Sequence, residues 1–475
     1  MTIARRTGWY LISSICVPLL SLLTLPLYTI RLGPEQYGIF ALGSSLATAV
    51  STTAGSISAL SLPVELSRCK GEDRSCYIGS VLLLGLIGAL LTSLAMFGAY
   101  LVASTALGLG SVGNKGILLL FAGALLSSLW AIAVEIISIE GRAKRYTILT
   151  IVQILTSIVA VCISLFVFND IENALFWGLF GSSFAGAIGA MNLLSGRLAF
   201  GSQRRWLPVA ARGSLAGVLA SLTESGKTAF ERSYLGIIVG VNQLGLLAHG
   251  QYYKNASMVL INTVSRSLVP TSLREAESSC PDFSVTLRFW APIQAMVAGI
   301  TISLALIGGE IIRLLTNGKF VNATPVAVAF MLILLLQTAG KTCHPLLLVR
   351  GKGYIYANLN TFSAILALIF LVITTPYLGI WGVILATAFQ TLFLRIALYW
   401  VTSTVYSLKF SDYWVIIGFV ATGLCILLEK QCNLTFVTRS GVLIIIYLII
   451  LCNFWAEIKI LKKKLRHHIN SKGKA

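Results

Sequence analysis

The stretch VGVNQLGLLAHG, at residues 239–250, repeats a stretch near the N-terminus, LGPEQYGIFALG, at residues 32–43. Gly, Gln, Gly, Ala and Gly recur at the same five places, 207 residues later. Each copy lies between two long apolar runs, and glycine tolerates the backbone conformations that tight turns require. The repeat therefore predicts the outer turn of a helical hairpin, present once in each half of the chain.

Two further landmarks recur at nearly the same offset. A Trp-Gly pair occurs at residues 177–178 and again at 381–382, each time opening an apolar run. A glycine followed by a basic residue occurs at 141–142 and at 351–352. Three markers in the same order indicate a duplicated six-helix unit. Paired halves with a site between them are typical of transporters.

The composition is that of an integral membrane protein. Of the 475 residues, 56% are hydrophobic and 11% are charged, whereas soluble domains contain about 25% charged residues. The net charge of +19 would suggest a nucleic-acid partner for a soluble protein, but membrane topology explains it without one. The nine cysteines contain no CxxC pair, so we expect neither a disulfide framework nor a metal site, and no cofactor.

Fourteen segments are long and apolar enough to span a membrane, which takes about 20 residues. They are 7–30, 38–62, 77–104, 115–139, 146–168, 172–196, 209–238, 244–270, 287–315, 325–349, 354–375, 378–402, 412–429 and 438–458. The predicted fold is an all-α polytopic membrane protein with two six-helix lobes, residues 1–206 and 207–410. Residues 411–475 would add two helices and a basic cytoplasmic tail.

The loops predict the orientation of the chain. With an even number of spans, both termini lie on one side, and the loops on that side carry 24 lysines and arginines against 5 on the other. The positive-inside rule then places both termini in the cytoplasm and the duplicated turns outside. No loop exceeds about 16 residues, so any function must be carried out within the bilayer.

Charged residues within spans are candidates for function, because each costs about 2.5–3.5 kcal/mol on insertion scales. Helical spacing gathers several of them, with polar neighbours, onto single faces of spans seven, eight and ten. The candidate substrate-binding residues are Lys227, Lys254, Lys341, Arg395, Asn255, Asn262, Gln337 and Arg266. Span two instead carries a run of serines and threonines.

Two interpretations of these charges stay open. Glu224 or Glu231 could simply neutralise Lys227 within one helix, and Arg266 could extend to the membrane interface. Alternatively, Glu224 or Glu231 binds a proton or sodium ion in one state and pairs with Lys227 in the other, which would couple transport to an ion gradient. Lys254 has no acidic residue three or four positions away, so local neutralisation does not explain it.

The chain resembles the O-antigen and polysaccharide flippases (Wzx type) of the multidrug/oligosaccharidyl-lipid/polysaccharide exporter superfamily. The resemblance rests on the two lobes, the turn at residues 31–38 (RLGPEQYG), the segment 231–236 (ERSYLG) and the LVP at 268–270. It implies a MATE-like fold in the bacterial inner membrane and alternating access around a cationic cavity. The implied cargo is an oligosaccharide on undecaprenyl diphosphate, with Lys227, Lys254, Lys341 and Arg395 lining the cavity.

The first two spans differ from those of the related peptidoglycan-precursor flippases, which carry cations early in the first lobe; here those spans have none buried. Three functions therefore compete: a polysaccharide flippase, a cation-coupled drug antiporter of the same fold, and, less favoured, a membrane polymerase or acyltransferase. Neither a large outer loop nor a catalytic constellation supports an enzyme. A flippase would work with membrane lipids, a polymerase and a chain-length regulator as partners.

Overall fold

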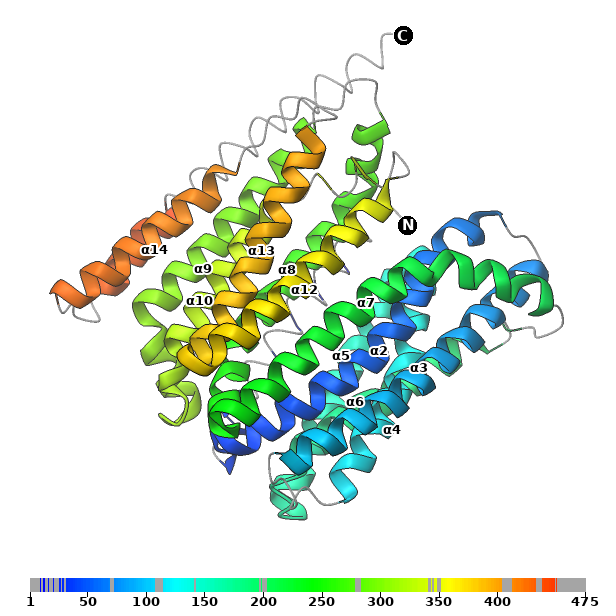
Figure 1. Cartoon of the computed structure of the whole chain (residues 1–475), viewed down its shortest axis with the longest axis horizontal. Coiled ribbons are helices and arrows are strands. Elements are labelled where there is room, and N and C mark those ends of the chain that lie inside the picture. Colours follow the sequence, from blue (N-terminus) through cyan, green and yellow to red (C-terminus); the bar gives the residue numbers. More distant parts are fainter. Residues whose placement is uncertain are drawn as a thin grey trace, which may run out of the picture.

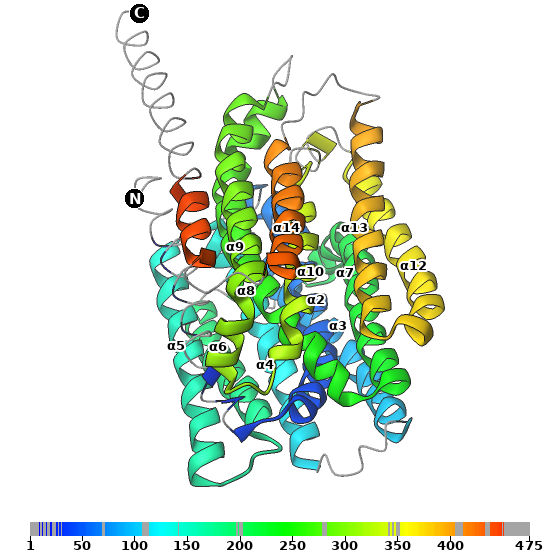
Figure 2. The same ribbon diagram turned by 90° about the vertical axis from the view of Figure 1, so that its left-hand side faces the viewer.

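A computed structural model describes residues 31–68, 72–106, 114–140, 142–195, 203–277, 283–340, 352–403, 412–432 and 438–448, with isolated positions between and before them. These residues are almost entirely helical (Figures 1 and 2). The helices are α2 (Pro34–Arg68), α3 (Glu72–Ala106), α4 (Asn114–Ile139), α5 (Ala143–Cys162), α6 (Ala174–Leu194), α7 (Gln203–Val239), α8 (Val241–Glu277), α9 (Ser284–Thr316), α10 (Thr324–Thr338), α12 (Gly353–Leu378), α13 (Ile380–Ser403), α14 (Tyr413–Cys432) and Thr438–Leu448. A π-helical turn, η1 (Ile163–Val167), continues α5, and a 3-10 turn, η2 (Val321–Ala323), precedes α10.

The all-α membrane fold predicted from the sequence is confirmed, and most helices match a predicted span within a few residues. The predicted first span, 7–30, lies largely outside the described residues. Eight of the described helices are long and apolar enough to cross a membrane. The long helices α2, α7 and α8 are not among these eight. A helix that lines a polar pathway does not need an apolar surface all round.

Two helical bundles make up the molecule, each with its own hydrophobic core. One core joins α2, α3, α4, α6 and the start of α7; the other joins α8, α9, α10, α12 and α13 with the start of α2. α14 packs along α9 at the edge of the second bundle. Figure 1 shows the bundles meeting at the end where α2 and α8 begin and spreading apart toward the other end. α7 packs along α2 of the first bundle and α12 of the second, so it lies between them.

The duplicated turns meet where the two bundles converge. A Cβ atom on Gly38 of α2 would lie 2.2 Å from the backbone oxygen of Val241. A Cβ atom on Gly245 of α8 would lie 1.8 Å from the backbone oxygen of Pro34. Gly38 and Gly245 occupy equivalent places in the two copies. The repeated glycines therefore let two helix N-termini cross with their backbones in direct contact.

The first glycine of each turn, Gly33 or Gly240, is present for a different physical reason. Gly240 is the single residue between α7 and α8, and its φ of +105° is a conformation that favours glycine. Gly33 does not have a positive φ. Its backbone N–H instead donates to Oε1 of Gln36 at 2.9 Å, and a Cβ atom there would lie 3.0 Å from that oxygen. Of the two turns, only that at Gly240 uses the conformational freedom of glycine at its first position.

α10 ends in the middle of the predicted span 325–349. The helix stops at Thr338, and Gly340 turns the chain with a φ of +61°. Freed backbone groups are satisfied by side chains: Trp290 Nε1 donates to the Thr338 oxygen at 2.7 Å, and Asp412 accepts from the Gly340 N–H at 3.3 Å. The helix within this predicted span is therefore interrupted, and tertiary hydrogen bonds offset the loss of helical ones.

Candidate functional site: a polar cavity between the bundles

A cavity of 540 Å³ lies between the bundles, behind the crossing of α2 and α8. Five helices of the second half and α2 of the first line it. Its polar and charged lining comprises Ser45, Thr48, Thr52, Glu224, Ser225, Lys227, Thr228, Glu231, Arg232, Gln251, Lys254, Asn255, Gln337, Tyr356, Asn360, Thr387, Gln390, Thr391 and Arg395. Four of these are cationic and two are acidic. Few apolar side chains face the cavity, so water or a polar ligand would fill it.

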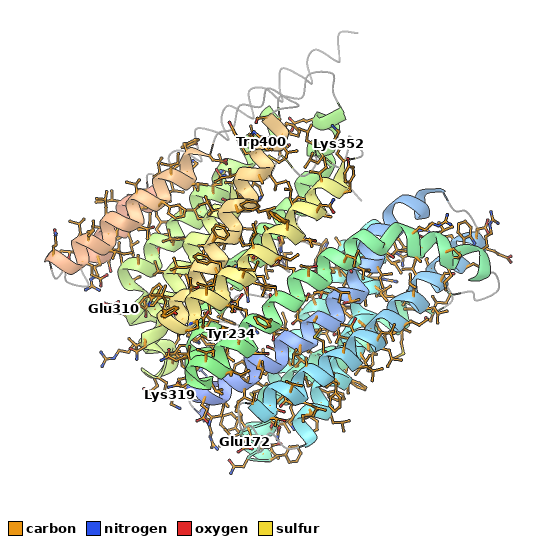
Figure 3. The ribbon with its side chains drawn as sticks, viewed as in Figure 1. Glu172, Tyr234, Glu310, Lys319, Lys352 and Trp400 are labelled. Carbon is orange, nitrogen blue, oxygen red and sulfur yellow. The ribbon has the colours of Figure 1, made fainter. Side chains whose placement is uncertain are left out.

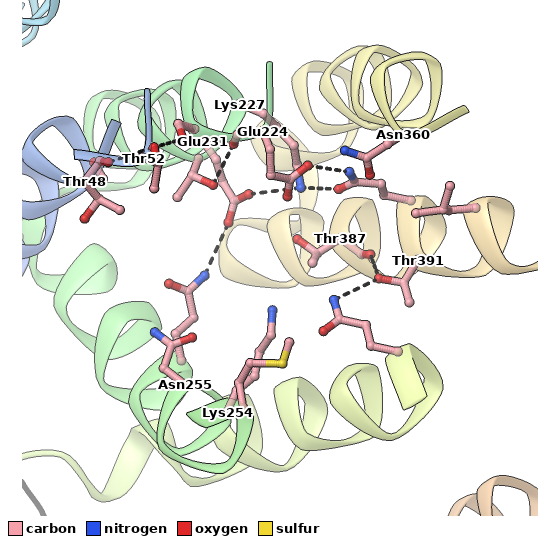
Figure 4. A pocket seen from close by; sticks show the side chains of 18 of the residues that line it. Thr48, Thr52, Glu224, Lys227, Glu231, Lys254, Asn255, Asn360, Thr387 and Thr391 are labelled. Atoms are coloured by element: carbon pink, nitrogen blue, oxygen red, sulfur yellow. Dashed lines mark hydrogen bonds and ion pairs between the residues drawn. The ribbon is translucent and has the colours of Figure 1, made fainter. Parts of the chain in front are cut away.

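A buried network on α7 and α13 holds Lys227. Its ammonium lies 3.9 Å from a Glu231 carboxylate oxygen, and both side chains are 4% exposed. It also donates to Oε1 of Gln390 on α13. The amide of Gln390 in turn donates to Glu224 at 3.0 Å. Figure 4 shows this chain of contacts along one wall of the cavity. Lys227 is thus largely neutralised within the protein.

Arg232 joins the two bundles below the crossing. Its guanidinium donates to the backbone oxygen of Ala41 at 2.6 Å and reaches Oγ of Ser44 at 3.5 Å, both on α2. It also donates to Oε1 of Gln251 on α8 at 3.0 Å. Ser44 and Gln251 are equivalent positions of the repeat, 207 residues apart. No pattern in the sequence distinguished this position of Arg232 from one at a membrane interface.

Lys254 is the cation that remains available to a ligand. It points into the cavity from α8 (Figure 4), on the side opposite the Lys227 network. It forms no ion pair within 4 Å among the described residues, and its ammonium lies 5.7 Å from the ring centroid of Phe330. Because a cation costs free energy in a partly buried site, a lysine without an ion pair here is a candidate anion-binding group.

α13 contributes a polar stripe at helical spacing. Thr387, Gln390, Thr391 and Arg395 recur at intervals of three and four residues, so they share one face of the helix. Arg395 donates to the backbone oxygen of Gln337 at 2.6 Å, at the end of α10. The break in α10 leaves that carbonyl oxygen without an intrahelical partner. The broken helix therefore positions a cavity cation.

Most of the candidate residues lie together. Seven line the cavity: Glu224, Lys227, Glu231, Lys254, Asn255, Gln337 and Arg395. Asn262 is exposed on α8 and does not line it. Lys341 and the side chain of Arg266 lie outside the described residues. Sequence reasoning missed Gln390 and the threonines of α13, although their helical spacing was present in the chain.

Solved structures share this architecture. The lipid II flippase MurJ, in an inward closed conformation, matches with a TM-score of 0.68 at 15% identity, over 94% of this chain and 99% of that one. An inward-facing multidrug resistance MATE family transporter of the MOP superfamily matches with a TM-score of 0.59 at 15% identity, over 89% and 100%. A MOP superfamily transporter from Pyrococcus furiosus, whose pocket is described as having reverse polarity, matches with a TM-score of 0.51 at 16% identity, over 90% and 96%.

The fold is therefore that of the MATE transporters and MurJ, a multi-pass membrane architecture. The chain belongs to the family described as polysaccharide biosynthesis protein, whose profile matches residues 3–274. No curated protein sequence matches the chain significantly. These findings confirm the resemblance on which the sequence-based predictions of fold and class rested.

Proposed function

We propose that this protein is a flippase that moves an oligosaccharide on undecaprenyl diphosphate across the bacterial inner membrane. The product would serve polysaccharide biosynthesis of the O-antigen, lipopolysaccharide or capsule type. The observation that carries this proposal is Lys254, an unpaired cation pointing into a polar cavity between two bundles. The family description and the likeness to MurJ support the same class of cargo.

The cargo explains the chemistry of the lining. A diphosphate is anionic and cannot cross hydrocarbon unaided, so the protein must supply counter-charges, which lysine and arginine do through charge-assisted hydrogen bonds. Lys254 would bind first, because Lys227 already pairs with Glu231. Asn255, Asn360 and the hydroxyls of α2 and α13 would contact sugars. Lys341 and Arg395 would hold the diphosphate toward the other end of the pathway.

A drug antiporter of the same fold fits this cavity less well. A site for organic cations needs net negative charge, whereas four cations and two acids line this one. Both acids are also engaged: Glu231 with Lys227, and Glu224 with Gln390. We therefore place the flippase first and keep the antiporter as the competing function. A polymerase and a chain-length regulator would act on the product as partners.

Alternating access would proceed by rocking of the bundles. The crossing of α2 and α8 closes one end of the cavity in this conformation. With the predicted topology that end is exterior, so the cavity would be accessible from the cytoplasm, where the cargo is assembled. Glu224 and Glu231 would couple the opening of the crossing to uptake of a proton or sodium ion, by exchanging it for contact with Lys227.

Replacing Lys254 tests the proposal. Lys254→Ala should lower surface polysaccharide in a deletion strain by roughly 10- to 150-fold, because a hydrogen bond to a charged group contributes about 1.5–3 kcal/mol. Lipid-linked intermediates should accumulate on the cytoplasmic face. Lys254→Arg should keep part of the activity, since the demand is for charge.

Lys319→Ala is the matched control, because Lys319 is exposed and does not line the cavity. It should export normally. Normal export by Lys254→Ala at normal protein level would show that Lys254 does not bind the cargo. Unchanged polysaccharide in the deletion strain itself would reject the flippase function.

A further inference from the structure

A second hollow lies at the edge of the second bundle, away from the central cavity. Its volume is 700 Å³, and α9, α10, α13, α14 and the helix Thr438–Leu448 surround it. Its walls are apolar: Ala305, Leu306, Val328, Ala329, Leu332 and Ile426. Trp381 also lines it and is 47% exposed, so the hollow opens on the outer surface of the bundle, which faces the membrane lipids. We call it the lateral groove.

One end of the lateral groove carries four charges. Arg439 donates to Glu310 at 2.8 Å and lies 3.1 Å from Glu429, so one arginine joins α9 to α14. Arg313 is exposed and has no ion pair among the described residues. It lies three residues after Glu310, on the same face of α9. The net charge of this end is zero. Glu310 and Glu429 share Arg439, which leaves Arg313 as the cation without an ion pair among the described residues.

The charged end lies at membrane-interface depth. Arg313 is three residues from the end of α9, and Trp381 is the second residue of α13. Tryptophan and arginine at helix ends are typical of the membrane interface. In Figure 3, Glu310 lies toward the same end of the molecule as Lys319, opposite Lys352 and Trp400. From there the apolar walls run along α9 toward the middle of the bilayer, as an acyl chain does.

We propose that the lateral groove binds a zwitterionic phospholipid with a primary ammonium, such as phosphatidylethanolamine. Arg313 holds the phosphate, and the carboxylates of Glu310 and Glu429, which Arg439 only partly satisfies, accept hydrogen bonds from the ammonium. One acyl chain lies along Leu332 and Ile426, against Trp381. A quaternary ammonium cannot donate these hydrogen bonds, and an anionic headgroup would face two carboxylates. The charge pattern thus favours this lipid over phosphatidylcholine and phosphatidylglycerol.

Quenching of Trp381 fluorescence by brominated acyl chains tests both position and selectivity. The full-length protein is reconstituted in phosphatidylcholine vesicles containing a small, varied fraction of brominated lipid. The signal of Trp381 is the difference between the wild type and Trp381→Phe. Brominated phosphatidylethanolamine should quench it at roughly tenfold lower mole fraction than the other two lipids, as expected for about 1.5 kcal/mol from a charged hydrogen bond.

Arg313→Gln should weaken quenching by all three lipids without affecting folding, because they share the phosphate and its side chain is exposed without an ion pair among the described residues. Glu310→Gln should lower the preference over phosphatidylcholine, and Lys319→Gln at the same end should change nothing. Equal quenching by all three lipids, or no difference between the wild type and Trp381→Phe, would overturn the proposal. Stronger quenching by a brominated polyprenyl phosphate would also overturn it, because the groove would then belong to a lipid-linked cargo.

Discussion

The N-terminal parts of α2 and α8 share a backbone arrangement but not a chemistry. At the crossing they are equivalent, with Gly38 against Val241 and Gly245 against Pro34. Two turns further on they differ: α2 carries Ala47 and Thr48 where α8 carries Lys254 and Asn255. The two copies of the repeat therefore share the contact that needs small residues and differ on the face that meets the cavity. The crossing is symmetric, whereas the charged lining of the cavity is not.

Arg232 shows how the asymmetry is built into the symmetric frame. Its guanidinium lies between Ser44 and Gln251, two equivalent positions, and bonds to both. The hydroxyl of Ser44 and the side-chain amide of Gln251 thus both accept hydrogen bonds from the guanidinium of Arg232. All six charged residues of the cavity lining come from the second half of the chain. The first half contributes hydroxyl groups and the partner surface for the crossing.

The largest effect is expected at the crossing. Gly245→Ala would place a methyl group 1.8 Å from the Pro34 oxygen, so the backbones must separate. We expect the closed end to open and a Thr48→Cys probe in the cavity to become strongly labelled by an impermeant reagent added outside cells. Gly98→Ala is the control, because nothing lies within 4 Å of that position. Unchanged labelling in Gly245→Ala would mean that this contact does not close the pathway.

An intermediate effect is expected in the acidic pair. Glu231→Gln should reduce gradient-driven transport in vesicles more than Glu224→Gln, because it leaves Lys227 buried without its ion-pair partner. Breaking a buried pair costs about 3–5 kcal/mol. Glu231→Gln combined with Lys227→Gln should restore protein level but not dependence on the gradient. Full gradient dependence after replacing both glutamates would remove them from the coupling mechanism.

The smallest effect is expected on the hydroxyl face of α2. Thr52 shares a hydrogen bond of 2.8 Å with Ser225 on α7. Thr52→Val should lower polysaccharide export by about two- to tenfold, since a neutral hydrogen bond contributes about 0.5–1.5 kcal/mol. If Thr52→Val lowered polysaccharide export as much as Lys254→Ala, the first half of the chain would contribute to recognition as strongly as the second.

Short-range patterns in the sequence predict the membrane fold and the repeat, and seven of the ten candidate residues line the cavity. Apolar segments of membrane length leave few alternatives to helices, and helical spacing assigns polar residues to one face, as for Glu224, Lys227 and Glu231. The repeat also marked Gly38 and Gly245, although not that they would touch. These features depend on short-range patterns, which a single chain displays directly.

Which of these faces meet depends on how the helices pack. The bonds from Arg232 to α2 and α8, from Gln390 to Glu224 and from Arg395 to the broken end of α10 join residues 19 to 191 positions apart. The break in α10 is stable because Trp290 of α9 and Asp412, just before α14, satisfy its free backbone groups. Tertiary packing also gives Lys227 a hydrogen bond to Gln390 of α13, whereas Lys254 has no ion pair among the described residues. Whether a buried cation is neutralised depends on the helices packed against it, and no local pattern encodes those contacts.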